Sequence, residues 1–287
     1  MSTGVVLAVL LAALLHASWK ALVKGDSDRW LTSGMIGGFG GVGALLVALV
    51  FLPLPQAHHW PWLIGSGALH ATYFILLVNA YAHGDLGKVY PIARGSAPLI
   101  IVALSAPIVG DIPDLWEIIA ILVIVSGVVA LSLEPGQVRT ANFTTIGLAL
   151  LTGACIAAYS LFDAVAIRTI GPEIETATLV YLCWLMVFAA IPIVAATYWA
   201  RRGHILIHLR AHAVQGIGGA FIAIASYGLI LYAFANASVA SVAALRETGV
   251  VFAALIGVLV LGEQFGKRRI PAAIMVASGA AALKFAG

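Results

Sequence analysis

A few ionisable residues stand inside otherwise apolar stretches of this 287-residue sequence. A charged side chain at the centre of a membrane span costs about 2.5–3.5 kcal/mol on insertion scales, so such residues should face a cavity or one another. Five residues have this placement: Lys20, Arg94, Asp163, Arg246 and Glu247. For Lys20 and Arg94 the alternative is that each side chain snorkels to a nearby interface.

Arg246 and Glu247 are the most informative pair, because both lie roughly 10 Å into their stretch at 1.5 Å per residue. Neighbouring helix positions point about 100° apart, so at least one of the two needs a partner on another helix or a ligand. Arginine suits a carboxylate or phosphate, while Asp163 and Glu247 could receive an ammonium group or carry a proton. The set therefore suits a zwitterion such as an amino acid. Alternatively, Arg94 and Arg246 are paired gates, or the charges form internal salt bridges.

Aromatic and amide side chains extend this set. Tyrosine and tryptophan rings can cradle apolar substrate parts or hold a cation, although an interfacial belt is a common alternative. Tyr73, Tyr159 and Tyr227 lie deeper than the other rings, and Asn79 adds a mid-span amide. The expected substrate-binding residues are Trp19, Lys20, Tyr73, Asn79, Tyr81, Arg94, Tyr159, Asp163, Tyr227, Arg246 and Glu247.

Three histidines recur at helical spacing, at positions i, i+4 and i+8: His204, His208 and His212. One helical face could present all three, which resembles a metal-ligand spacing. Three arginines stand around them and would repel a cation: Arg201, Arg202 and Arg210. We therefore expect a segment lying on the membrane surface, and neither a metal nor another cofactor.

The sequence carries no Gly-x-Ser-x-Gly, His-Glu-x-x-His or Walker motif, so an ATP-driven pump and a zinc protease are unsupported. We expect no catalytic residues and no enzyme activity, with a membrane-embedded hydrolase, a channel or a receptor as alternatives. Cys155 and Cys183 both lie in apolar runs, which disfavours a disulfide framework.

The elements that position these residues are expected to be membrane helices. The sequence is 62% hydrophobic and 9% charged, with a mean hydropathy of +1.06, whereas soluble domains are about half apolar and a quarter charged. Ten stretches can cross about 30 Å of hydrocarbon, which predicts an all-α integral membrane protein with spans near 4–24, 30–52, 61–84, 89–109, 115–134, 144–167, 176–199, 212–235, 239–261 and 269–286. In the second span, Gly34/Gly38 and Gly37/Gly41 predict close helix packing.

An internal repeat relates the two halves of the chain. Residues 94–131 and 246–283 align without gaps at an offset of 152. The alignment matches Arg94 with Arg246, Gly110 with Gly262, Asp111 with Glu263, Gly127 with Gly279, and Leu131 with Leu283. A repeat of five spans must be inverted in its second copy, and inverted repeats are typical of secondary transporters with a midplane site. The expected repeats are residues 1–139 and 140–287.

The chain resembles a ten-helix member of the drug/metabolite transporter superfamily with two EamA-type halves. The resemblance covers nearly the whole length and is carried by residues 17–20, 84–95, 245–248 and 261–263. Asp111 departs from the usual glutamate but keeps its charge. The resemblance implies alternating access around a central cavity lined chiefly by the first, third, fourth, sixth, eighth and ninth helices.

The expected function is secondary transport across the cell inner membrane of small polar metabolites, above all amino acids or similar zwitterions, in the export direction. The alternative is import of a phosphonate or sugar-like metabolite. Expected partners are the small-molecule substrate, the lipid bilayer and protons as a candidate coupling ion. We expect no nucleic acid partner and a monomer or weak homodimer.

The orientation in the membrane is predicted differently by two arguments. Outside the spans, ten basic residues fall on the side opposite the termini and two, Arg168 and Lys284, fall on the terminal side. The positive-inside rule then places the termini outside the cytoplasm. The resemblance implies cytoplasmic termini.

Overall fold

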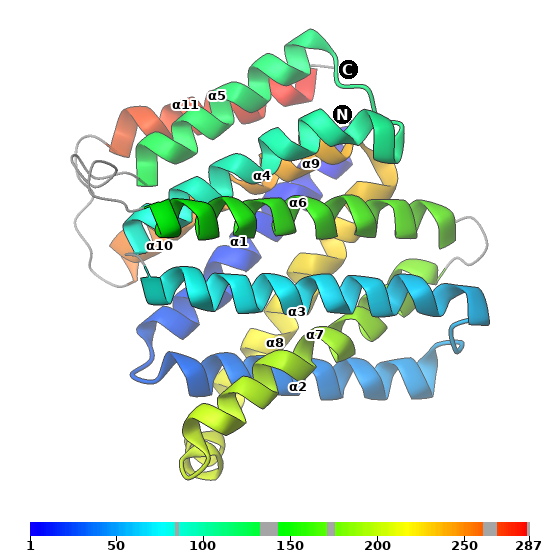
Figure 1. Ribbon diagram of the computed structural model, residues 1–287, viewed down its shortest axis with the longest axis vertical. Coiled ribbons are helices and arrows are strands. Elements are labelled where there is room, and N and C mark those ends of the chain that lie inside the picture. The colour runs from blue at the N-terminus through cyan, green and yellow to red at the C-terminus, as the bar shows by residue number, and fades with distance from the viewer. Residues whose placement is uncertain (84–85, 133–142, 171–175, 261–268, 286–287) are drawn as a thin grey trace.

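The computed structural model describes residues 1–83, 86–132, 143–170, 176–260 and 269–285, without the side chains of residues 78, 81–83, 86–91 and 132, and the regular elements in these ranges are all helical. In chain order these elements are α1 Thr3–Gly25, α2 Arg29–Phe51, the 3-10 helix η1 Ala57–His59, α3 Trp60–His83, α4 Leu86–Val109, α5 Leu115–Ser132, α6 Phe143–Ile170, α7 Ala177–Arg201, α8 Ile205–Asn236, α9 Val239–Arg246, α10 Gly249–Leu259 and α11 Arg269–Phe285. In Figure 1, α2, α3 and α6 run nearly parallel, and α1, α7 and α8 cross them obliquely. The predicted all-α class is confirmed for the described part of the chain.

Seven stretches of the described chain are long and apolar enough to cross a membrane: Thr3–Gly25, Arg29–Phe51, Ile92–Val109, Phe143–Ile170, Ala177–Arg201, Ile205–Asn236 and Val239–Leu259. The three other predicted spans correspond to α3, α5 and α11, of which α5 contains a shorter apolar helix, Leu115–Leu131. The chain is thus a multi-pass membrane protein. Gly262 and Glu263, the second member of the predicted Gly-acid repeat, lie outside the described residues.

Side-chain caps fix where several helices begin. The Ser2 side chain accepts a hydrogen bond from the Val5 amide at the start of α1. The Asp28 carboxylate accepts from the Trp30 and Leu31 amides at the start of α2. Such caps satisfy backbone N–H groups that have no partner inside the helix. Within the short polar connection between α1 and α2, Asp28 therefore fixes where α2 begins.

Small residues let α2 and α7 approach closely. A Cβ atom built on Gly34 would lie 2.3 Å from Thr197 Oγ1, and one on Gly41 would lie 2.6 Å from Ala190 Cβ. A Cβ on Gly37 would lie 2.6 Å from Ile193 Cγ2. Without room for a methyl group, helix backbones can meet only through glycine at these points. The close packing predicted for the second span is confirmed.

Helices α5 and α11 meet through a reciprocal pair of glycines. A Cβ atom on Gly127 of α5 would lie 2.7 Å from Val276 Cγ2 and 3.0 Å from the Ala272 carbonyl oxygen. A Cβ atom on Gly279 of α11 would lie 2.7 Å from Ile124 Cγ1 and 2.9 Å from the Ala120 carbonyl oxygen. Each helix thus presents one glycine to the backbone of the other. Figure 1 shows the two helices together at one edge of the bundle.

Candidate functional site

The deepest charged contact joins α4 to the end of α9. Arg94 Nε lies 2.9 Å from Glu247 Oε2, and the two residues are only 6% and 2% exposed. Arg246 is 8% exposed, and its Nη2 donates to the Tyr159 hydroxyl on α6 at 3.1 Å. At least one of Arg246 and Glu247 was predicted to need a partner on another helix or a ligand, and both have a partner on another helix.

A break in the helix positions Arg246 and Glu247. The span predicted at 239–261 is found over Val239–Leu259, but its helix is interrupted, because α9 ends at Arg246 and α10 begins at Gly249. The Thr248 hydroxyl donates to the Leu245 carbonyl at 2.8 Å, and the Glu247 amide donates to the Ala244 carbonyl at 3.0 Å. Glu247 and Thr248 keep right-handed helical dihedral angles, with φ −67° and ψ −15° for the first and φ −54° and ψ −21° for the second. The break is therefore a tightened 3-10 turn between the two helices, and both residues are buried.

Lys20 adds a third basic side chain near this break. It is half-buried on α1 and lies within electrostatic reach of Arg94, Arg246 and Glu247. On the same helix the Trp19 indole N–H donates to His16 Nδ1 at 3.3 Å. We call Lys20, Arg94, Arg246, Glu247 and Tyr159 the arginine cluster. It holds three basic groups and one carboxylate.

Asp163 forms a second centre, with hydroxyl groups as its partners. Its side chain is fully buried on α6. The Tyr181 hydroxyl of α7 donates to Oδ1 at 2.7 Å, the Ser66 hydroxyl of α3 donates to the same oxygen, and the Tyr227 hydroxyl of α8 donates to Oδ2. A buried carboxylate is tolerated only when hydrogen bonds replace its lost hydration. We call these four residues the hydroxyl cluster.

Aromatic rings join the two clusters. Tyr159 and Asp163 stand one helical turn apart on α6, so both side chains lie on one face. The His70 ring centroid lies 4.3 Å from that of Tyr159 and 5.6 Å from that of Tyr227. The Tyr73 and Tyr159 centroids lie 5.7 Å apart. The structure thus brings eight predicted site residues into one connected region between α1, α3, α4, α6, α8 and α9: Lys20, Tyr73, Arg94, Tyr159, Asp163, Tyr227, Arg246 and Glu247.

The other predicted site residues lie differently. Trp19 is half-buried beside His16 and Lys20. Its ring centroid lies 5.9 Å from Lys20 Nζ. Asn79 is exposed and donates to the Ile75 carbonyl one turn earlier, so it stands outside the buried clusters. The Tyr81 side chain lies outside the described residues.

Ser66 and Tyr181 are site residues that sequence reasoning missed. Serine is small and common in membrane helices, so Ser66 gave no signal beyond its one-turn spacing from His70. Tyr181 stands five residues into the predicted span 176–199, where an interfacial tyrosine is the usual interpretation. Only the contact with Asp163 identifies either residue.

Two apolar cavities lie away from these clusters. One of about 370 Å³ is lined by residues of α2, α7 and α8, including Met35, Val194 and Leu209. Another of about 330 Å³ is lined by residues of α3, α4 and α6, including Leu69, Leu104 and Phe162. Neither is lined by the arginine cluster, whose Arg94, Arg246 and Glu247 are buried. In this conformation these three side chains are thus shielded from solvent.

Comparison with known proteins identifies the family. Residues 143–284 match the EamA-like transporter family, and this range coincides with the second predicted repeat. No protein with a curated description matches the chain. A solved structure titled "Crystal structure of protein" is 19% identical, covers 100% of both chains and superposes with a TM-score of 0.75, which shows a shared fold. The chain belongs to the EamA-like transporter family and, with it, to the drug/metabolite transporter superfamily.

Proposed function

We propose that this membrane transporter is a secondary transporter that exports small zwitterionic metabolites, above all amino acids, across the cell inner membrane by alternating access. The observation that carries the proposal is the buried Arg94–Glu247 ion pair beside Arg246, at a helix break inside the bundle. A 3-10 turn within a helix often marks a functional hinge, and charged groups at membrane depth are typical of transporter substrate sites. The site residues lie on α1, α3, α4, α6, α8 and α9, in keeping with a central site.

Two inverted five-helix repeats, residues 1–139 and 140–287, would supply the alternating movement. The contacts between α5 and α11 support this repeat. The offset of 152 maps Gly127 onto Gly279, and it also maps the residues that contact one glycine onto the residues that contact the other. Ala120 and Ile124, which touch Gly279, map onto Ala272 and Val276, which touch Gly127. A two-fold relation between the halves produces such reciprocity, and a chance crossing of two helices does not require it.

A zwitterion fits the ion pair better than a simple ion does. If a substrate carboxylate takes the place of Glu247 beside Arg94, Glu247 is left buried without its partner, which is strongly unfavourable. An ammonium group on the same substrate offers Glu247 a replacement. An amino acid can therefore open the Arg94–Glu247 contact while leaving neither side chain unpaired. Tyr73 and Tyr159 would contact its apolar part.

Asp163 is the residue we propose to carry a coupling proton. Its carboxylate is buried one turn from Tyr159, and rings connect it to the arginine cluster. Replacement Asp163→Asn keeps hydrogen-bonding capacity but removes the titrating group. In proteoliposomes this variant should still exchange labelled substrate across the membrane at equal concentrations, yet lose accumulation driven by a pH gradient. Accumulation equal to that of the wild-type protein would remove protons from the mechanism.

A second candidate, import of a phosphonate or similar anion, is favoured by one observation. The arginine cluster holds three basic groups against one carboxylate. Phosphonate oxygens would suit the guanidinium groups. This candidate predicts binding of anions that lack an ammonium group.

The experiment that tests the proposal is a ligand-stabilisation screen followed by transport. A ligand that binds only the folded state raises the melting temperature. We expect an amino acid to do so for the wild-type protein, and Arg246→Gln and Glu247→Gln to abolish the shift. Arg202→Gln, at an exposed residue stacked on Trp199, is the matched control and should keep it.

Transport then decides between the two candidates. Cells loaded with the labelled ligand should release it faster when they contain the wild-type protein than when they contain Glu247→Gln. A shift produced by phosphonates and not by amino acids, with uptake in place of release, would replace the first candidate by the second. If no metabolite class shifts the melting temperature or crosses the membrane, both candidates fail.

A further inference from the structure

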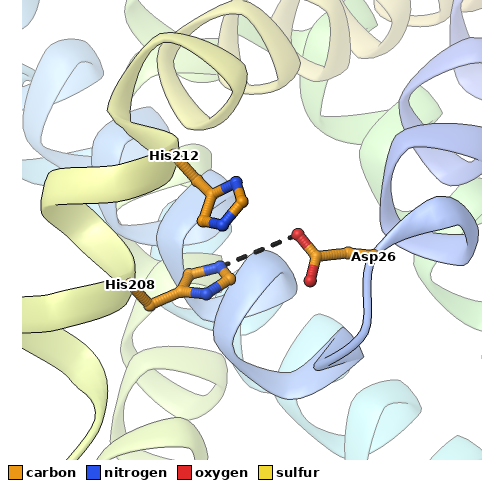
Figure 2. Close-up of side chains that lie close together, drawn as sticks. All are labelled: Asp26, His208 and His212. Atoms are coloured by element: carbon orange, nitrogen blue, oxygen red, sulfur yellow. Dashed lines mark ion pairs between the residues drawn. The ribbon is translucent and has the colours of Figure 1, made fainter.

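A compact group of ligand-type side chains lies at the end of the bundle where α1 meets α2. Asp26 stands in the connection between these helices, and His208 and His212 stand near the start of α8 (Figure 2). One donor atom from each of the three side chains lies within 4.8 Å of the others. Figure 2 shows both imidazoles facing the Asp26 carboxylate, with His208 Nε2 3.9 Å from Asp26 Oδ2.

The carboxylate is held in place by its own connection. The Asp28 amide donates to Asp26 Oδ1 at 3.0 Å, which leaves Oδ2 turned toward His208. The side chains of Asp26 and His208 are only 4% and 10% exposed. Burial alone would raise the pKa of Asp26, but hydrogen bonds from the Asp28 amide and the Thr32 hydroxyl lower it below its ordinary value. The Asp26 carboxyl group is therefore ionised at neutral pH.

The two imidazoles are arranged by helix geometry. His208 and His212 are four residues apart, and their ring centroids lie 4.5 Å apart at an interplanar angle of 29°. His212 has φ −124° and ψ 17°, a kink within α8. The Thr32 hydroxyl lies 3.3 Å from His208 Nε2. His204, the third member of the sequence pattern, is exposed and does not belong to the group.

The arginines that argued against a metal are directed elsewhere. Arg201 Nε lies 2.6 Å from Asp28 Oδ2, so its charge is paired. The Arg202 guanidinium carbon lies 4.0 Å from the Trp199 ring centroid. Arg210 is exposed and stands two residues from His208, about 200° around the helix. The sequence-based objection therefore loses its physical basis in the structure.

We propose that Asp26, His208 and His212 bind a late first-row transition-metal ion, of which zinc fits best. Two neutral imidazoles and one carboxylate are a ligand set that such ions favour. Three protein ligands leave a fourth tetrahedral position for water. Metal–ligand bonds of about 2.0–2.2 Å place donor atoms roughly 3.3 Å apart. Small side-chain rotations that bring the donor atoms of Asp26, His208 and His212 closer by roughly 1–1.5 Å would therefore complete the site.

A bound ion would tie the α1–α2 connection to α8. Helices α1 and α8 also take part in the buried clusters. Lys20 of α1 belongs to the arginine cluster, and Tyr227 of α8 belongs to the hydroxyl cluster. The ion would thus brace the two helices at one end of the bundle. This inference does not depend on which substrate is carried or on whether transport occurs.

The test uses the purified full chain, freed of any polyhistidine tag, with Zn²⁺ and Co²⁺ as probes. Equilibrium dialysis followed by elemental analysis should find one Zn²⁺ per chain. Co²⁺ should give the intense visible bands of a four-coordinate ion. Asp26→Asn, His208→Gln and His212→Gln should each weaken binding by more than about tenfold, because even loss of an outer-shell partner costs about 10–100-fold.

The matched control is His204→Gln, which removes an exposed imidazole one turn from His208 and should leave binding unchanged. Zinc X-ray absorption of the wild-type protein, which needs no variant, should show two imidazoles in the first shell. Absence of stoichiometric binding, a first shell without imidazole, or equal loss in His204→Gln would overturn the proposal. Circular dichroism of the metal-free variants identifies any that fail to fold, and the absorption result then decides.

Discussion

At the scale of single residues, the Arg94–Glu247 contact makes each partner depend on the other. Both side chains are almost completely shielded from solvent. Removing one partner of a buried ion pair leaves an uncompensated charge and costs about 3–5 kcal/mol, whereas removing both costs much less. Each residue of the pair therefore needs the other in order to stay buried and charged, while the pair as a whole adds little to stability.

This interdependence gives a quantitative prediction. Arg94→Gln and Glu247→Gln should each lower the free energy of unfolding by about 3–5 kcal/mol. The double variant should be more stable than the sum of the single changes implies, by about 0.5–3 kcal/mol. Denaturant unfolding of the detergent-solubilised protein measures the four corners of this cycle, with exposed Lys284→Gln as control. Strict additivity would mean that the two residues do not interact.

Charge and depth in the sequence were enough to find the arginine cluster, because charges inside apolar stretches are rare and need partners. They were not enough to find the hydroxyl cluster. Ser66 and Tyr181 are ordinary residues in membrane helices, and only tertiary packing brings them to Asp163. Asn79 differs from the residues of both clusters, because it is exposed and its side chain donates to the Ile75 carbonyl of its own helix. Depth in a span does not say which way a side chain faces.

At the scale of elements, the break between α9 and α10 is the feature that apolar periodicity could not predict. Residues 239–259 form one apolar stretch long enough to span a membrane. Their hydropathy therefore predicts a single helix. Contacts across the bundle lie beside the break, such as Arg94 with Glu247 and the approach of Gly249 to the Ala13 carbonyl, which a Cβ would reach at 3.3 Å. A hydropathy pattern carries no information on such contacts.

The α5–α11 contact leads to a prediction about two glycines. Gly127→Ala and Gly279→Ala should each destabilise the fold by about 1–3 kcal/mol, because the added methyl group meets the partner backbone. The two costs should be similar, since the contacts are reciprocal. Thermal unfolding of the single variants measures this effect.

The control is Gly147→Ala on α6, where a Cβ has nothing within 4 Å. That variant should keep or slightly raise the melting temperature, because alanine is the better helix former by about 1 kcal/mol. A neutral Gly279→Ala beside a costly Gly127→Ala would argue against the reciprocity.

At the scale of the whole molecule, two ion pairs hold connections together at different ends. Arg168 at the end of α6 binds Asp111 at 2.7 Å and donates to the carbonyls of Phe234 and Ala237. It thereby joins the α4–α5 connection to the end of α8. Arg201 at the end of α7 binds Asp28 between α1 and α2 at 2.6 Å. With alternating spans, each pair joins connections that are expected on the same side of the membrane.

That grouping sharpens the question of orientation, because Arg201 belongs to the ten basic residues on the side opposite the termini. Positive residues are retained on the cytoplasmic side, so we expect the Asp28–Arg201 end to be cytoplasmic and the Arg168–Asp111 end external. A cytoplasm-only fluorescent reporter fused after Gly287 should then stay dark, and a reporter active only outside should work. Replacing Arg201, Arg202 and Arg210 by glutamine together should weaken this preference.

A bright cytoplasmic reporter would support the orientation that the resemblance implies. The Asp28–Arg201 end would then lie outside the cytoplasm and the Arg168–Asp111 end inside it. The Asp26–His208–His212 group lies at the Arg201 end, so its side of the membrane changes with this result. Inside the cell the site would meet the buffered metal of the cytoplasm, and outside it would meet the metal of the surroundings. Orientation therefore decides which pool of metal ions can reach the start of α8.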